Sequence, residues 1–259
     1  MKKTIISIFA AVIALSSCQS LDLVSTYQVA SSNVWGKATL ARQAVNGIYN
    51  EFYTRSSTTV NEDNWNVMYE AYSSVMDTDK NWHENQKVCY GNGTPSSGTF
   101  SEMYKYYYTF VFRANDAITH IDQVPDMDAS EKAKLKAEAK FLRAYGYMNL
   151  NVLYRGVPLY LEYIEDASKA NRPRSAEKEV WEAIIKDLTD CVEEEALPDR
   201  YLAGSQDYGR VSRGVALAYR GQAYQWMAAR SGEDPLPYIR LALADYEALE
   251  GLGYALYTG

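Results

Sequence analysis

Hydrophobic residues recur with helical spacing along most of this chain, and the strongest pattern lies between positions 133 and 153. Two apolar faces alternate there at intervals of three and four residues. One face consists of Ala133, Ala137, Phe141, Ala144, Tyr145, Met148 and Val152, and the other of Leu135, Ala139, Leu142, Gly146 and Leu153. A helix that is apolar on two sides must be covered on both, so this segment is predicted to be an internal layer of the fold.

The boundaries of this central helix also follow from the sequence. Ser130 with the acidic Glu131 is predicted to cap its start. Arg155 and Gly156 are predicted to end it, and the following residues 157–160, which include a proline, are predicted to be extended. Its polar stripe is narrow and is formed by the lysines at positions 132, 134, 136 and 140.

Six other segments have helical periodicity. They cover residues 37–52, roughly 62–76, 99 or 100 to about 124, 175 to about 195, 212–231 and 237–251. Ser175 and Ser212 are predicted to open the fourth and fifth of these helices. The first two are expected to pair, and the third is expected to form an antiparallel hairpin with the central helix.

Helices in pairs, with many Ala and Gly residues in the second member, are typical of tetratricopeptide-like repeats. The helical pairs do not recur at a strict period of about 34 residues in this sequence. We therefore predict a mainly all-α fold of degenerate tetratricopeptide-like helical hairpins, with long loops and little β-structure. The longest loop is predicted at residues 77–98, which are rich in Asn, Gly, Ser and Asp.

The first residues have the pattern of an export signal. Lys2 and Lys3 precede an apolar run from 5 to 15 that is too short to cross a bilayer. The sequence Leu-Ser-Ser immediately before Cys18 resembles a bacterial lipobox, in which the cysteine is acylated and becomes the mature N-terminus. The predicted organisation is a lipoprotein signal peptide at 1–17, a lipidated tether at 18–36 and a helical-repeat domain at 37–259. An ordinary secretory cleavage next to a chance cysteine is the alternative.

Composition and charge narrow the possible partners. The chain has 259 residues, is 47% hydrophobic and carries a net charge of −7. Removing the signal takes away Lys2 and Lys3 and leaves −9. An acidic surface argues against nucleic acid and against electrostatic binding to anionic membranes, so the lipid would provide the membrane anchor. Cys89 and Cys191 could pair, although the helical position of Cys191 favours a buried thiol.

The sequence offers little for catalysis. It contains two histidines, neither in a metal-binding spacing, and no nucleophile-elbow or phosphate-loop motif. Acidic residues are plentiful, but nothing singles out the two carboxylates that a glycosidase needs. We predict no enzymatic activity, no cofactor and no metal site.

Three segments carry a resemblance to a known family. The stretch EAKFLRAYGYMNLNVLYRGVPL at 138–159 resembles the signature of the SusD/RagB family of surface lipoproteins, and the segments 172–188 and 209–214 fit its following helices in order. Members are typically about twice as long, so the resemblance implies an N-terminal half. It also implies an outer-membrane lipoprotein that faces the cell surface, binds a glycan (or a peptide, as RagB-type relatives do) and works with a TonB-dependent SusC-like transporter.

One aromatic residue stands apart from the helical faces. The chain has 23 Tyr and 5 Trp, and most of them lie on faces expected to be buried, whereas Trp82 lies in the polar loop, three residues before Asn85. The resemblance implies that a Trp and an Asn at this spacing form part of a glycan site. Trp82 would stack on a sugar ring and Asn85 would hydrogen-bond its hydroxyls. Alternatively, Trp82 folds back onto the helices.

The sequence thus predicts a non-enzymatic lipoprotein of the outer membrane that binds an oligosaccharide and delivers it to a partner transporter. Two rival functions remain open. One is a helical-repeat scaffold that binds protein or peptide, in which case Trp82 would face inward. The other is a secreted glycan-active enzyme with paired carboxylates in a cleft.

Overall fold

The computed structural model describes residues 34–57, 90–94 and 98–255, and the helices below belong to one compact unit that begins at Trp35. The helices are α3 (Ala38–Ser57), α6 (Gly98–His120), α7 (Ala129–Tyr154), α8 (Glu177–Glu193), α9 (Arg213–Arg230) and α10 (Leu236–Gly251). Two short 3-10 turns, η1 (Ile121–Gln123) and η2 (Ala167–Ala170), complete the structure of these residues, among which there is no strand. The predicted all-α class is confirmed.

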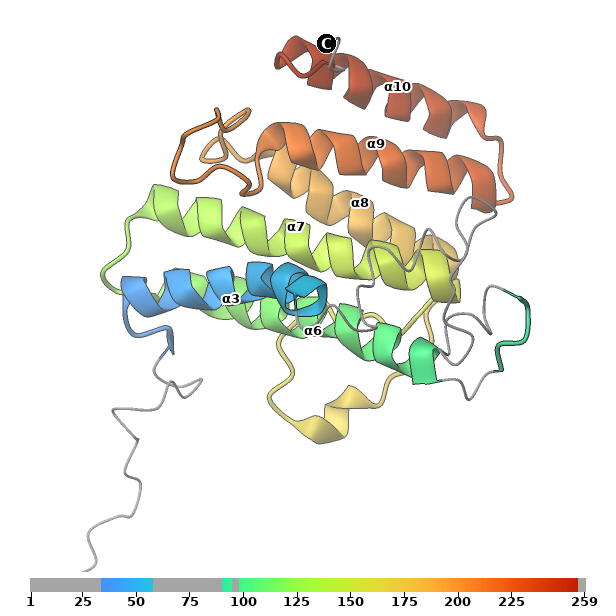
Figure 1. The fold of residues 1–259 in the computed structure, drawn as a ribbon, viewed down its shortest axis with the longest axis horizontal. Coiled ribbons are helices and arrows are strands. Elements are labelled where there is room, and N and C mark those ends of the chain that lie inside the picture. Colours follow the sequence, from blue (N-terminus) through green and yellow to red (C-terminus); the bar gives the residue numbers. More distant parts are fainter. Residues whose placement is uncertain (1–33, 58–89, 95–97, 256–259) are drawn as a thin grey trace, which may run out of the picture. The chain divides into compact units, whose positions relative to one another are not determined.

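Each helix from α6 onward packs against the next one along the chain, and α3 packs on both α6 and α7 (Figure 1). The η1 turn reverses the chain between α6 and α7, so these two form the predicted antiparallel hairpin. A stack in which each helix contacts its sequence neighbours is the arrangement of tetratricopeptide-like repeats. The helical-repeat prediction therefore holds for the described residues.

Helix α7 is the internal layer that its two apolar faces predict. It contacts α3, α6 and α8, and half of its residues are buried. Close packing depends on Gly146, because a Cβ atom there would lie 2.8 Å from the backbone oxygen of Tyr107 and 3.1 Å from the Cβ of Phe110. A side chain at this position would therefore push α6 away from α7.

The predicted start of α7 is wrong by two residues. The N-cap is Asp128, whose carboxylate accepts a hydrogen bond from the backbone N–H of Glu131 at 2.8 Å, and Ser130 already lies inside the helix. An anionic cap satisfies a free N–H group and also interacts favourably with the positive end of the helix. The predicted end is correct, because Arg155 is the C-cap and adopts a left-handed conformation with φ of 54°.

The start of α8 also differs from the prediction, whereas the start of α9 agrees with it. Ser175 donates its backbone N–H to Val157 O at 3.2 Å, so it belongs to the contact with the extended segment, and Ala176 is the N-cap. The Glu179 carboxylate accepts from the N–H of Ala176 at 2.9 Å. Ser212 caps α9 as predicted, accepting from the N–H of Val215.

Some predictions fall on residues that the structure does not describe. The predicted helix at 62–76 and most of the loop at 77–98 lie outside the described residues, as does Cys89. Cys191 is a free, buried thiol whose Sγ donates to Ala137 O at 3.1 Å, as its helical position predicts. Among the helices that the structure describes, none combines the length and hydrophobicity needed to cross a bilayer.

Candidate functional site

Cys18, Trp82 and Asn85 lie outside the described residues, so the roles assigned to them stay predictions. The residues that follow the predicted loop along the chain form the first turns of α6, and these are described. A candidate site can therefore be built from α6 and from the extended segment after α7, which lies alongside it.

Aromatic side chains recur along α6 at intervals of four and eight residues and form two groups, because Tyr104 to Phe112 share one face and His120 lies farther round the helix. They are Tyr104, Tyr108, Phe112 and His120, and the segment after α7 adds Tyr160 and Tyr163 next to them. Ring centroids of neighbouring members are 4.7 Å apart for Tyr104 and Tyr108, 5.6 Å for Tyr108 and Phe112, and 5.4 Å for Phe112 and Tyr160. His120 and Tyr163 are 5.0 Å apart at the other end. We call these six residues the aromatic track.

A shallow cavity of about 270 Å³ opens over the first part of the track. Its lining consists of Tyr104, Lys105, Tyr108, Thr109, Phe112 and Tyr160. Tyr108 and Tyr160 are nearly buried and form its floor, whereas Phe112 keeps 42% of its surface exposed. Burial raises the pKa of Tyr108, so its hydroxyl stays neutral and donates to Pro158 O at 2.7 Å.

Within the described part of the chain, the extended segment that carries Tyr160 pairs with no strand, and side chains bind most of its carbonyl groups. Four consecutive carbonyls, from Pro158 to Leu161, accept hydrogen bonds from side chains of Tyr108, Arg172, Asn115 with Tyr147, and Arg143 in that order. Buried carbonyl and N–H groups must be paired to avoid a large desolvation cost. These contacts therefore fix the segment, and Tyr160 with it, against the helical hairpin.

Arg143 is the centre of this arrangement. It is only 6% exposed, and its guanidinium donates to both carboxylate oxygens of Asp187 on α8 at 2.8 and 2.7 Å. Its Nη1 also donates to the Asn115 side chain at 2.7 Å and to Leu161 O at 2.9 Å. Burial raises the pKa of Asp187, while the bidentate pairing with Arg143 opposes that effect.

The rim of the track carries charges of both signs. Arg172 pairs with Glu162 at 2.5 Å, and its guanidinium lies over the Tyr160 ring at 5.2 Å from the centroid. His120 contacts the Asp116 carboxylate at 2.9 Å and stacks on Trp35, whose indole N–H donates to Asp116 at 3.2 Å. The charges around the aromatic rings are therefore largely compensated.

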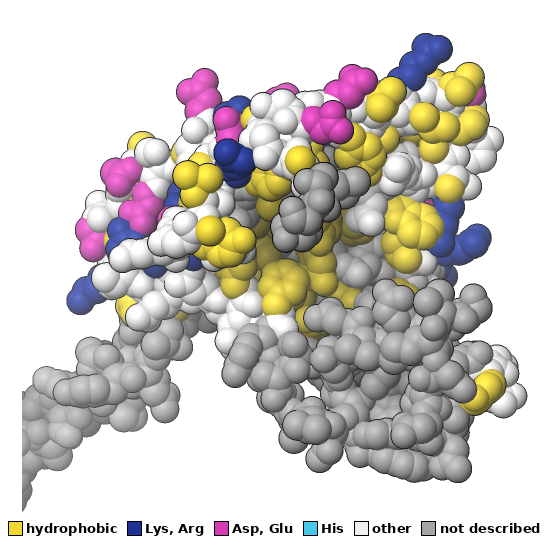
Figure 2. Space-filling view, turned by 45° about the horizontal axis from the view of Figure 1, so that its top comes forward, with side chains coloured by type: hydrophobic (Ala, Val, Ile, Leu, Met, Phe, Trp, Pro, Cys, Tyr) yellow, Lys and Arg dark blue, Asp and Glu magenta, His cyan; other side chains and the backbone are white. Residues whose placement is uncertain are grey.

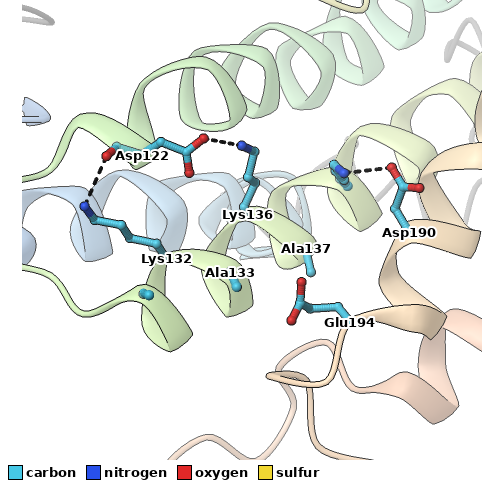
Figure 3. Close-up of a pocket in the computed structure, with 9 residues that line it drawn as sticks. Asp122, Lys132, Ala133, Lys136, Ala137, Asp190 and Glu194 are labelled. Carbon is cyan, nitrogen blue, oxygen red and sulfur yellow. Dashed lines mark hydrogen bonds and ion pairs between the residues drawn. The ribbon is translucent and has the colours of Figure 1, made fainter.

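A second groove, of about 340 Å³, lies along the lysine stripe of α7 (Figure 3). Its three lysines are engaged: Lys132 donates to Asp122 O, Lys136 pairs with the Asp122 carboxylate, and Lys140 pairs with Asp190 at 2.7 Å. An anion would have to displace these carboxylates, so this groove is a solvated, salt-bridged surface rather than an anion site.

The motif at 209–214 has a structural role. Arg210 pairs with the fully buried Glu138 of α7, donates to the Asn46 side chain of α3 at 2.7 Å and lies over the Tyr49 ring. Burial raises the pKa of Glu138, and Arg210 and the Tyr49 hydroxyl oppose this. The motif therefore ties the loop before α9 to α3 and α7.

Among the described residues, no group of three or more His, Cys, Asp or Glu side chains could hold a metal ion. The surface instead offers aromatic faces. On the face shown in Figure 2, hydrophobic side chains lie at the surface among acidic and basic ones. The sequence did carry a signal for the first group of the track, namely Tyr104, Tyr108 and Phe112 at intervals of four residues on α6.

Comparison with known proteins places these features in context. Residues 21–224 match the SusD-like family described as starch-binding and associating with the outer membrane. SusD-like protein P38 of Formosa agariphila is 30% identical over 158 residues, which are 60% of this chain and 29% of that protein.

Solved structures agree with this match. A SusD-like protein from Bacteroides fragilis superposes with a TM-score of 0.71 and 25% identity, over 89% of this chain and 41% of that one. A laminarin-binding SusD-like protein superposes with a TM-score of 0.69 and 25% identity, over 85% and 46%. The matched part spans less than half the length of each of these relatives.

Proposed function

Because the chain belongs to the SusD-like family, we propose that it is part of an outer-membrane surface lipoprotein that captures an oligosaccharide and delivers it to a TonB-dependent SusC-like transporter. The observation that carries this proposal is the family match over 21–224, which includes α3 to α8 and most of α9. The similarity to a laminarin-binding protein over 85% of the chain supports a glycan as the ligand.

The proposed organisation gives each part of the chain a task. Residues 1–17 direct export, acylated Cys18 and the tether up to residue 36 hold the protein on the membrane, and residues 37–259 form the helical domain. Trp82 stacks on a sugar ring, and Asn85 donates to and accepts from its hydroxyls. The protein performs no chemistry on the sugar, and the transporter supplies the energy for uptake.

The binding proposal is tested with the full-length protein on an array of soluble oligosaccharides, followed by calorimetric titration of each ligand that binds. We expect binding without the appearance of new reducing ends. Trp82→Ala should weaken binding about tenfold, which corresponds to the loss of one aromatic stacking contact. Tyr208→Ala removes a tyrosine that is 65% exposed in the loop before α9 and should leave affinity unchanged.

Two results would contradict this function, and a third would contradict the role of Trp82. Release of new reducing ends would support the glycan-active enzyme. Binding of peptides but of no glycan would support the peptide-binding alternative. Normal glycan affinity in Trp82→Ala would show that Trp82 packs inward and does not contact the sugar.

The membrane anchor has a separate test. Cells that express the wild type and Cys18→Ser are labelled with a radioactive fatty acid and fractionated. We expect label and outer-membrane association in the wild type only, because several acyl chains anchor a protein far more firmly than its acidic surface could. Label on Cys18→Ser would contradict the proposed attachment site.

A further inference from the structure

We propose that Asn92 is a site of self-modification, at which the chain converts its own asparagine into aspartate and isoaspartate without an enzyme. The site is the pair Asn92 and Gly93, in the segment 90–94 that precedes α6. This inference goes beyond the proposed function and does not depend on it.

The surroundings of this pair favour a reaction between its two members. Gly93 has no side chain to crowd its backbone nitrogen, and Gly91, on the other side of Asn92, adopts a φ of 72°. Asn92 and Gly93 are both exposed and belong to neither a helix nor a turn. Among the residues that the structure describes, none forms a hydrogen bond with the Asn92 side chain or the Gly93 N–H. The backbone can therefore bend until the two groups meet.

The reaction needs only water. The backbone nitrogen of Gly93 attacks Cγ of Asn92, the new N–C bond closes a five-membered imide ring, and the side-chain nitrogen leaves as ammonia with the proton that Gly93 loses. Water then opens the ring at either carbonyl. Opening at Cγ gives aspartate, and opening at the backbone carbonyl of Asn92 gives isoaspartate. Both products carry a new carboxylate, which makes the segment before α6 more negative by one charge at neutral pH.

The chain contains a second Asn-Gly pair, Asn46 and Gly47, which serves as an internal comparison. Asn46 is also exposed, but it lies inside α3, and its side-chain oxygen accepts a hydrogen bond from Arg210 Nη1 at 2.7 Å. The imide ring cannot close while the backbone keeps the helical ψ of about −42°. Since α3 would have to open first, we expect Asn46 to be preserved.

A third asparagine separates the effect of the glycine from that of the irregular backbone. Asn171 is exposed and non-helical, with φ of −88° and ψ of 87°, but the residue after it is Arg172. The Arg172 side chain crowds the attacking nitrogen and is itself held by Leu159 O and Glu162. We therefore expect Asn171 to react more slowly than Asn92.

The test follows all three asparagines in one sample. The full-length protein is incubated at mildly basic pH in water enriched in oxygen-18, and its peptides are analysed by mass spectrometry. Because water opens the ring, each event during the incubation introduces one heavy oxygen and is distinguished from reaction during sample preparation. We expect aspartate and isoaspartate at Asn92 within days, well ahead of Asn46 and Asn171. Conversion of Asn92 no faster than that of Asn171 would overturn the site.

Gly93→Ala tests the attack by the backbone nitrogen, because its Cβ crowds that nitrogen while Asn92 itself is kept. We expect conversion of Asn92 to slow about tenfold, equivalent to about 1.4 kcal/mol in the activation barrier. Gly47→Ala is the matched control and should leave the conversion of Asn92 unchanged. An unchanged rate in Gly93→Ala would overturn the mechanism. Circular dichroism melts of both variants check that the fold is intact.

Discussion

One polar face of α7 carries both buried and exposed ion pairs, and the two kinds do different work. Arg143 is buried, pairs with Asp187 and holds the carbonyl of Leu161. One and two turns earlier on the same face, Lys140 and Lys136 pair with carboxylates at the surface. The comparison teaches that the polar residues of one helix can serve either to fix a neighbouring segment or merely to keep an edge solvated.

Their expected energies differ for a physical reason. A surface pair in water contributes about 0–1 kcal/mol, because solvent screens the charges. Breaking a buried pair costs about 3–5 kcal/mol, because the remaining charge is left unpaired in a medium of low polarity. The extended segment with Tyr160 depends on the buried pair of Arg143 and Asp187.

The largest effect is predicted for Arg143→Ala. This change leaves Asp187, Asn115 and the carbonyl of Leu161 without their shared partner, so the free energy of unfolding should fall by about 3–5 kcal/mol. Urea denaturation at pH 7 measures it. A loss of less than about 1 kcal/mol, the value expected of a surface pair, would erase the contrast between the buried and the exposed pairs.

The next prediction compares two helical glycines. Gly146→Ala should destabilise the fold by about 1–3 kcal/mol, because the new Cβ would meet Tyr107 O and Phe110. Gly47→Ala on α3 meets nothing within 4 Å and should stabilise by about 0.5–1 kcal/mol. Thermal melts of both variants provide the measurement, and a shift of the same sign in both would contradict the tight α6–α7 contact.

A smaller loss is predicted for Tyr147→Phe. The Tyr147 hydroxyl donates to Tyr160 O at 3.0 Å and accepts from the N–H of Tyr160 at 2.5 Å. Its removal leaves a buried N–H group unsatisfied and should cost about 1–2 kcal/mol by urea denaturation. Faster hydrogen exchange at Tyr160 should accompany the loss, and unchanged exchange there would argue that the segment is held by other contacts.

The smallest effect on stability concerns the exposed pair of Lys140 and Asp190 and depends on pH. Partial burial alone would raise the pKa of Asp190, but hydrogen bonds from Lys140 and Lys186 lower it below its usual value. A carboxyl whose pKa is lowered by folding stabilises the fold above its unfolded pKa of about 3.9, and this stabilisation is lost as the pH falls.

Asp190→Asn should therefore cost less than about 1 kcal/mol at pH 7. Its free energy of unfolding should converge with that of the wild type as the pH is lowered below about 4. Denaturant unfolding at a series of pH values measures this difference. A gap that widens on acidification would have the wrong sign for this pair.

The spacing of hydrophobic residues predicted most of the fold, because the apolar faces that must be buried determine which helices pack together. The two apolar faces of the segment 133–153 correctly predicted an internal helix, in which Gly146 allows the close approach of α6. The caps at Ser130 and Ser175 were wrong because several polar residues stand near each helix start, and tertiary contacts decide which of them serves. Ser175, for instance, is engaged with Val157.

The candidate site was harder to predict for two reasons. The contacts of Arg143 join residues 28 and 44 positions away in the sequence, and no local pattern encodes such pairs. The aromatic track shares α6 with a core face, so its period is hidden among buried aromatic residues such as Tyr107. Trp82 and Asn85, in contrast, were singled out by a resemblance and await measurement.

Hydrogen exchange with and without a saturating oligosaccharide from the array tests most directly whether the candidate site on α6 or the lysine stripe of α7 takes the ligand. We predict that the ligand slows exchange in the first turns of α6 and in residues 157–163, and leaves residues 129–140 unchanged. Protection confined to residues 129–140, or none in α6 and the extended segment, would contradict the account.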